Sequence, residues 1–255
     1  MMQRSLFLTV AAIIVVGVSA APRAQQAPAV EPDAIAAIEK MGGYLRTLTS
    51  YQVDATISTE EVLTNGQKVT FHNVTHVLAR MPDRLRVSVQ GDRRNRLYVY
   101  DGREFTMLAR SANYYATAPA PPTIRELANV LEEKFGLEMP LADLFRWGGP
   151  ESDTGAITSA MFVGVSPVAG VNCGHYAYRQ KGLDWQVWIQ QGDYPRPRRL
   201  VLTTVTDEAR PQYVATLDWN LAPSLNESAF TFVPPAGAGR VVFAGAPLAR
   251  QETGP

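Results

Sequence analysis

The sequence has one cysteine, Cys173, and three histidines among its 255 residues. A single cysteine excludes an intramolecular disulfide, so the fold must be stabilised by packing. With 46% hydrophobic residues, the chain has enough apolar side chains to bury a large core. It also lacks an excess of charge of either sign, because 24 basic and 24 acidic residues balance. We therefore do not expect the basic surface of a nucleic-acid-binding protein.

Long apolar runs are scarce, and the one at the N-terminus is short. Arg4 precedes an apolar run at 6–18, which ends in small residues at 18–20. This layout is typical of a secretory signal peptide, and the run is shorter than the about 20 residues of a membrane span. We expect residues 1–20 to be removed; their retention as an anchor is the alternative. No cysteine could start the mature chain and carry a lipid, so we expect a periplasmic protein without stable membrane insertion.

The rest of the sequence predicts a single domain at 33–243, between a flexible leader at 21–32 and a poorly ordered tail at 244–255. A helix is expected to begin at Asp33, whose carboxylate can accept N–H groups of the first turn. A second helix is expected at Thr123, where a threonine and a glutamate three residues later form a capping box. The segments around these helices mostly alternate apolar and polar residues, which is typical of β-strands.

About eleven strands are predicted, and an Asn-Gly pair at 65–66 predicts a tight hairpin between the first two. A short third helical segment is expected at 141–147. The first predicted strand begins at 51. The others are expected at 67–79, 85–90, 96–100, 104–110, a short segment at 113–117, 159–168, 173–179, 185–190, 198–206, 212–220 and 229–233. The helices are too few and too clustered for a parallel α/β sheet. We predict an α+β fold, in which one large bent antiparallel sheet has helices on one face.

The segment around the only cysteine contains the residue types of a thiol active site. Cys173 and His175 share a strand face, but they lie about 7 Å apart along the chain. Direct proton transfer requires roughly 2.6–3.2 Å. Asp184 lies near a predicted turn, and nothing nearby would lower the pKa of the thiol. We expect the cysteine to be a small buried hydrophobic residue and no residue to be catalytic.

Other catalytic and metal-binding patterns are equally weak. His72 and His76 fall on a predicted strand, which places them about 13 Å apart and prevents chelation of one ion. The adjacent glutamates at 60–61 and 132–133 diverge in either secondary structure. We therefore predict no metal site, no cofactor and no enzyme activity.

Several strands are apolar on both faces, which indicates that both faces are covered or that one lines a cavity. Simple core packing under the helices is the first interpretation. The functional alternative is an apolar groove on the concave face of a curved sheet, where a hydrophobic ligand would bind. The residues predicted for this groove are Leu97, Val99, Trp185, Val187, Ile189, Leu217 and Trp219. Basic clusters at 93–96 and 196–199 are expected to be solvated loops, with contact to anionic lipid headgroups as the alternative.

Six short strings occur in an order and spacing that resemble an uncharacterised family of predicted periplasmic proteins, domain of unknown function 2092. The resemblance extends over about 33–243. The strings are YDG (100–102), PLADL (140–144), CGHYA (173–177), DWQVWI (184–189), PQY (211–213) and FTFVPP (230–235).

That family resembles the superfamily of LolA- and LolB-type lipoprotein carriers and receptors, which includes RseB-type sensors. The resemblance implies a half-open antiparallel β-barrel of about eleven strands, with two or three helices covering its concave face. It also implies that acyl chains or similar apolar ligands bind between barrel and helices, and it brings no catalytic residues. Fold does not determine function, so the functional step is an analogy.

We therefore predict a soluble periplasmic binding protein for a lipid, a lipoprotein acyl chain or another amphiphile. The first alternative is a periplasmic sensor that binds an envelope protein partner, and it predicts an exposed patch or strand edge instead of a deep cavity. An enzyme that uses Cys173 and His175 is the third hypothesis.

Overall fold

The computed structural model describes residues 30–137, 139–147, 149 and 154–243. The predicted signal peptide at 1–20, the predicted tail at 244–255 and the predicted leader up to residue 29 lie outside the described residues. Within the described ranges, no helix has the length and apolarity of a membrane span.

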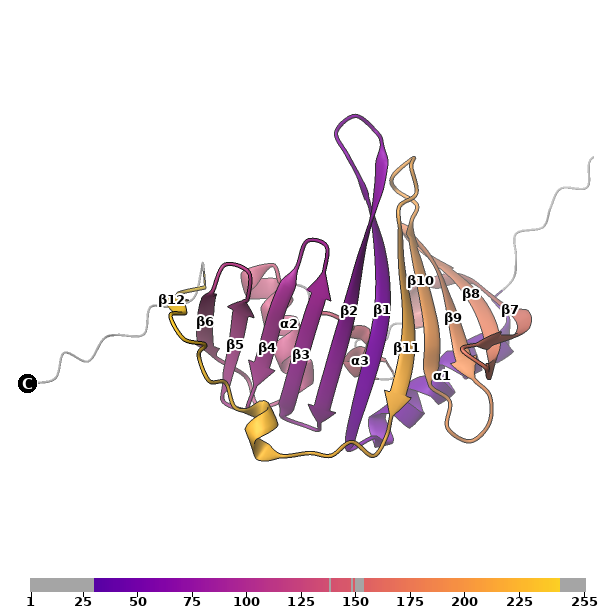
Figure 1. Cartoon of the computed structure of the whole chain (residues 1–255). Helices are drawn as coiled ribbons and strands as arrows, with labels where there is room; N and C mark the ends of the chain where they lie inside the picture. Colours follow the sequence, from indigo (N-terminus) through magenta and orange to yellow (C-terminus); the bar gives the residue numbers. More distant parts are fainter. Residues whose placement is uncertain (1–29, 138, 148, 150–153, 244–255) are drawn as a thin grey trace, which may run out of the picture.

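The described strands form one sheet of twelve strands, in the order β12-β6-β5-β4-β3-β2-β1-β11-β10-β9-β8-β7 (Figure 1). All neighbours pair antiparallel except β12, which pairs in parallel with β6. The strands are β1 Ser50–Val62, β2 Lys68–Arg80, β3 Arg84–Gly91, β4 Asn95–Tyr100, β5 Glu104–Ala109, β6 Tyr114–Pro119, β7 Ile157–Val168, β8 Val171–Gln180, β9 Leu183–Gln190, β10 Pro197–Thr204, β11 Gln212–Asn220 and β12 Gly239–Val241. Because β12 and β7 end the order without pairing with each other, the curved sheet is open. The predicted fold, a half-open antiparallel barrel with helices, is confirmed.

The helices lie on one face of the sheet, behind it in the view of Figure 1. They are α1 Pro32–Thr47, α2 Ile124–Phe135 and the short α3 Asp143–Arg146. Helix α1 packs on β7–β10 in one hydrophobic cluster, and α2 and α3 pack on β1–β6 and β11 in another. The Tyr178 hydroxyl, buried in the first cluster, donates a hydrogen bond of 2.8 Å to the Ala34 carbonyl and ties α1 to β8. The concave face is thus covered in two separate places.

The local signals for the helices are only partly confirmed. At α2, the Thr123 hydroxyl accepts a hydrogen bond from the Glu126 N–H, and Gly136 ends the helix in the left-handed conformation that glycine favours. At α1, the prediction that Asp33 caps the helix was wrong. The helix begins one residue earlier, because Pro32 occupies the first turn with a backbone angle already suited to a helix, and Asp33 lies inside that turn.

Strands β1 and β2 form a hairpin that projects beyond the rest of the sheet (Figure 1). In its lower half, side chains at every second position of β1 are buried, as at Val53, Ala55 and Ile57. Gly66 adopts a φ of 82° in the turn, which confirms the predicted Asn-Gly hairpin. The upper half rises above the core, so the hairpin forms a wall beside the concave face.

The segment after β11 differs from its prediction. A strand was predicted at 229–233, but a 3₁₀ helix, η2 Glu227–Phe230, occupies this position and packs against β3. The segment crosses the outer face of the sheet before it reaches β12 (Figure 1). Phe230 and Phe232 have the two-residue spacing of a strand, but they anchor the irregular segment 221–238, which we call the strap. Its two prolines, Pro234 and Pro235, cannot donate hydrogen bonds to a sheet.

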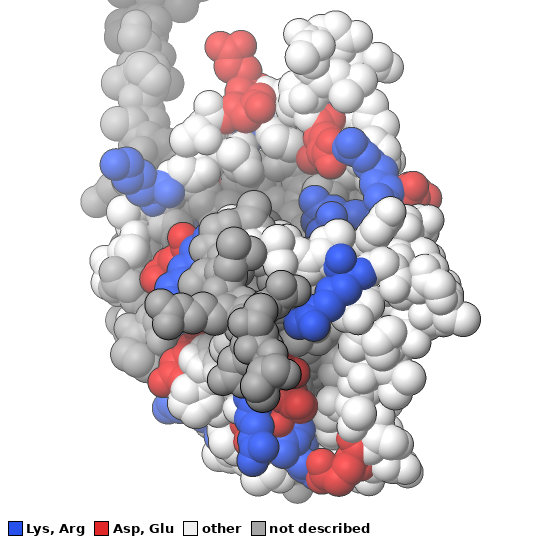
Figure 2. All heavy atoms as spheres, turned by 90° about the vertical axis from the view of Figure 1, so that its left-hand side faces the viewer, with Lys and Arg blue, Asp and Glu red and all other residues white. Residues whose placement is uncertain are grey.

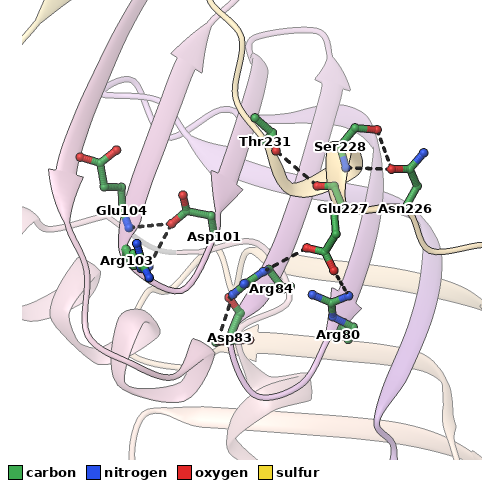
Figure 3. Close-up of polar contacts among 10 residues, drawn as sticks. All are labelled: Arg80, Asp83, Arg84, Asp101, Arg103, Glu104, Asn226, Glu227, Ser228 and Thr231. Atoms are coloured by element: carbon green, nitrogen blue, oxygen red, sulfur yellow. Dashed lines mark hydrogen bonds and ion pairs between the residues drawn. The ribbon is translucent and has the colours of Figure 1, made fainter.

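Polar contacts hold this strap in place. The Glu227 carboxylate lies between the guanidinium groups of Arg80 and Arg84 (Figure 3). Next to it, the side chain of Asn226 accepts a hydrogen bond from the Ser228 N–H. Phe230 is 1% exposed, so the main apolar anchor of the strap is fully buried.

We expect Phe230→Ala to lower the free energy of unfolding by about 3–5 kcal/mol, the range for removal of a buried phenylalanine. The matched control is Val233→Ala in the same strap, because Val233 is 76% exposed and its change should stay within about 0.5 kcal/mol. Urea titration followed by far-UV circular dichroism measures both. Equal effects of the two substitutions would contradict the anchoring role of Phe230.

Candidate functional site

A cavity of about 500 Å³ lies between the concave face of the sheet and the segment 139–147, which includes α3. Its lining comes from β1, β2, β3, β4, β10 and β11 on the sheet side. The volume falls within the 300–1,000 Å³ typical of small-molecule sites. The cavity occupies the part of the concave face between the two helix-covered clusters.

The sheet forms an apolar floor. Ile57, Val89 and Leu217 line the cavity and are almost fully buried, because strand alternation turns them to the concave face. Leu200 and Leu202 continue the floor on β10. The adjacent polar groups are satisfied locally: the fully buried Thr75 hydroxyl donates to the Asn73 side chain at 2.9 Å. An apolar ligand would therefore not leave the Thr75 hydroxyl without a partner.

The cover of the cavity is the segment 139–147. Met139, Leu141 and Leu144 are buried and contribute apolar side chains to the lining. Leu141 has a φ of 57°, a left-handed conformation that costs a residue other than glycine about 1–2 kcal/mol. Burial of its side chain offsets this cost. Arg146 holds the cover to α2 through an ion pair with Glu132.

The mouth of the cavity is polar. At the projecting hairpin, Arg93 forms an ion pair with Glu61, and its guanidinium lies 4.7 Å from the centre of the Phe71 ring. Asp92 and Arg94, on the turn between β3 and β4, also line the cavity. The site thus combines an apolar interior with a charged rim.

The face on the β6 and β12 side of the molecule carries charges of both signs (Figure 2). Basic and acidic side chains are interspersed on this face.

Of the seven residues predicted to bind a ligand, only Leu217 lines this cavity. Trp185, Val187 and Ile189 do lie on the concave face, but α1 covers them. Trp219 packs between the two hydrophobic clusters, with its ring centroid 5.4 Å from that of Tyr51. Leu97 and Val99 belong to the opposite face of the sheet, where Phe232 of the strap covers them. The structure therefore distributes the predicted set over three locations.

Sequence reasoning missed most of the lining. The cover residues Met139, Leu141 and Leu144 were assigned only to a helix or to the string PLADL. Leu202 and Tyr213 have the same alternation as the predicted residues, and this alternation could have identified them. The basic cluster at 93–96 was noted, but its position at a cavity mouth depends on long-range pairing of β3 with β2.

The structure separates the three residues considered for catalysis. Cys173 is fully buried, and its thiol donates to the Val171 carbonyl. His175 stacks on Trp188 with ring centroids 3.8 Å apart, and its Nε2 lies 2.9 Å from the Gln186 amide oxygen. Hydrogen bonds from Arg179 lower the pKa of the Asp184 carboxyl, which also pairs with Arg210. Each residue thus has its own partners, and no described contact joins them into a triad.

The described residues contain no group of three or more potential metal-binding side chains. His76 instead pairs with Asp54 on the neighbouring strand, with Nδ1 and Oδ1 2.6 Å apart. His72 binds the turn between β3 and β4 through its backbone, because its N–H donates to the Asp92 carboxylate.

The chain was compared with known proteins. A family model described as "Predicted periplasmic protein (DUF2092)" matches residues 34–244. Among curated proteins, none matches the chain.

The chain is also similar to three solved structures. An uncharacterised conserved protein from Thermus thermophilus is 12% identical, with a TM-score of 0.48 and coverage of 82% of this chain and 99% of that one. The lipoprotein LppX from Mycobacterium tuberculosis is 11% identical, with a TM-score of 0.43 and coverage of 77% and 100%. A LolA superfamily protein from Nitrosomonas europaea is 14% identical, with a TM-score of 0.38 and coverage of 78% and 97%.

The environment of Cys173 leads to a direct test of thiol chemistry. Burial raises the pKa of the Cys173 thiol, so the nucleophilic thiolate is scarce at neutral pH. We expect iodoacetamide at pH 7 to alkylate the native protein at least about tenfold more slowly than the urea-unfolded protein. Mass spectrometry of timed samples measures both rates. Fast modification of the native protein would revive the hypothesis of a thiol enzyme.

Proposed function

The chain belongs to the family of predicted periplasmic proteins called domain of unknown function 2092, and on this basis we propose that it is a periplasmic binding protein for an amphiphile. The ligand is a lipid, a lipoprotein acyl chain or another molecule with an apolar tail and a polar head. The tail occupies the cavity between the sheet and the segment 139–147, and the head lies at the mouth.

The observation that carries this proposal is the apolar cavity of about 500 Å³. A tightly packed core has few voids larger than a water molecule, so a cavity of this size on the concave face supports a binding role. Burial of acyl methylenes contributes about 0.8 kcal/mol each. A chain of ordinary length can therefore bind without any charged clamp.

The proposal is one of binding without catalysis. Cys173 is buried away from the cavity lining, and His175 is stacked on Trp188. The cavity is lined mainly by aliphatic and aromatic side chains, together with polar residues of β1 and β2 such as Thr59 and Asn73 and with charges at its rim. Such a lining favours retention of an unreacted ligand.

The alternative, a sensor that binds the peptide of an envelope protein, predicts an exposed strand edge. Strand β7 ends the sheet order, and Phe162, Val163 and Val165 on it are 45%, 52% and 56% exposed. Glu31 already binds this edge, since its N–H donates to the Ala160 carbonyl and its carboxylate accepts from the Phe162 N–H. The rest of the edge, with apolar side chains, is the kind of surface to which an extended peptide can add. This feature keeps the sensor as the second candidate.

The carrier and the sensor can be tested together by native mass spectrometry of the protein purified from the cell envelope, followed by solvent extraction. We expect a co-purified lipid, or stoichiometric uptake of an added single-chain amphiphile such as 1-dodecanol. A protein that is empty and ignores added amphiphile contradicts the carrier function. A single stoichiometric protein partner on lipid-free material supports the sensor.

A charge placed in the cavity wall should weaken this uptake. Leu202 is half-buried and lines the cavity, so we expect Leu202→Glu to reduce the affinity for 1-dodecanol by at least about tenfold, or ~1.4 kcal/mol. Val74→Glu is the matched control, because Val74 is 40% exposed and does not line the cavity. Isothermal titration calorimetry measures the affinities, and urea titration checks that both variants fold. Unchanged binding by a folded Leu202→Glu variant would place the ligand elsewhere.

A further inference from the structure

We propose that the mouth of the cavity selects amphiphiles with an anionic head, which Arg94 and Arg96 bind. This inference rests on the proposed function, and it adds the chemical class of the ligand. The head is a phosphate, sulfate or carboxylate group attached to the apolar tail.

Arg94 lies on the turn between β3 and β4, and Arg96 lies on β4 directly after it. The Asp92 N–H donates to the His72 carbonyl, and the Asp92 carboxylate accepts from the His72 N–H at 2.8 Å. Gly91 allows this close approach, because a Cβ atom at this position would lie 2.4 Å from the His72 carbonyl oxygen. The turn is therefore braced against β2 at the rim of the cavity.

Both arginines lie on the cavity side of the sheet. Arg94 lines the cavity directly. Arg96 lies two residues before Tyr98, a lining residue, and therefore shares its face of β4. Its partner across the strand pair is Val89, which also lines the cavity. Two guanidinium groups thus originate beside the apolar floor.

The carboxylates of the lining already have partners. Glu61 pairs with Arg93, Glu132 pairs with Arg146, and Asp92 accepts the His72 N–H. The remaining acidic residue of the lining, Asp143, also has an interaction. The charges of Glu61 and Glu132 are therefore already balanced by Arg93 and Arg146.

Arg94 and Arg96 differ from these groups, because neither side chain has a hydrogen-bond or ion-pair partner among the residues that the structure describes. A guanidinium group presents a planar fork of donors that matches the oxygens of phosphate and carboxylate groups. An anionic head would satisfy these donors while its tail lies on the floor formed by Val89 and Leu217. A cationic head would be repelled, and an uncharged head would form only the weaker hydrogen bonds of a neutral acceptor.

The test compares ligands with one tail and different heads. Isothermal titration calorimetry with dodecyl phosphate, 1-dodecanol and inorganic phosphate, each below any micelle-forming concentration, separates head from tail. We expect dodecyl phosphate to bind about tenfold more tightly than 1-dodecanol, the gain from a charged hydrogen bond. We expect inorganic phosphate alone to bind at least about a hundredfold more weakly than dodecyl phosphate, because it lacks the buried methylenes.

Substitutions assign the preference to residues. Arg94→Gln should remove most of the tenfold preference for dodecyl phosphate over 1-dodecanol. Arg103→Gln is the matched control, because it removes the same charge from the exposed β4–β5 turn at the opposite end of the sheet, where Arg103 lies beside Asp101 (Figure 3). The double variant Arg94→Gln/Arg96→Gln should abolish the preference, and higher salt should weaken it in the wild type.

The outcomes distinguish this inference from the function on which it rests. Equal affinities for dodecyl phosphate and 1-dodecanol would overturn the anionic head while leaving the amphiphile-binding function intact. Inorganic phosphate that binds as tightly as dodecyl phosphate would also overturn it, in favour of a site for the free ion. If neither amphiphile binds, both proposals fail.

Discussion

Strand alternation places an apolar row on the concave face of nearly every strand, and this face is larger than the helices can cover. Helix α1 covers β7–β10 through contacts such as that of Tyr178 with Ala34. Helix α2 and the short α3 cover β1–β6. The part of the concave face between them, around Leu217 and Leu202, is covered by the segment 139–147, in which α3 is only four residues long. The cavity, its apolar lining and its position near the sheet's projecting hairpin all follow from this mismatch between sheet and helices.

The same constraint explains why the outer face needs the C-terminal strap. Strand β4 is apolar on both faces, with Tyr98 on the concave side and Leu97 on the other. An outward leucine on a central strand would be exposed to water without a second layer. Phe232 supplies that layer, and the contact of Glu227 with Arg80 holds the strap where it begins. One sheet is thus covered by helices on one side and by an irregular segment on the other.

Much of this fold could be predicted from the sequence, because its local signals agree with the tertiary structure. The alternation of Val53, Ala55 and Ile57 and the glycine at 136 are examples. The candidate site was harder to predict, since period two shows that Trp185 and Ile189 share a face but not which cover lies on that face. The docking of α1 decides this, and it depends on contacts between residues distant in sequence. The string at 230–235 misled for the opposite reason, because two phenylalanines two residues apart that pack on a sheet, Phe230 buried and Phe232 partly buried, occur equally in a strand and in an irregular segment.

The pairing of β12 with β6 has a consequence for biogenesis. Domains emerge and organise from the N-terminal side during synthesis, so Leu97, Val99 and Leu108 are present long before the residues that cover them. Until the last strap residues have been synthesised, these three apolar side chains are exposed beside the sheet edge of β6, with which β12 has not yet paired. The incomplete chain thus exposes an apolar patch on the outer face of its sheet until the strap has been synthesised.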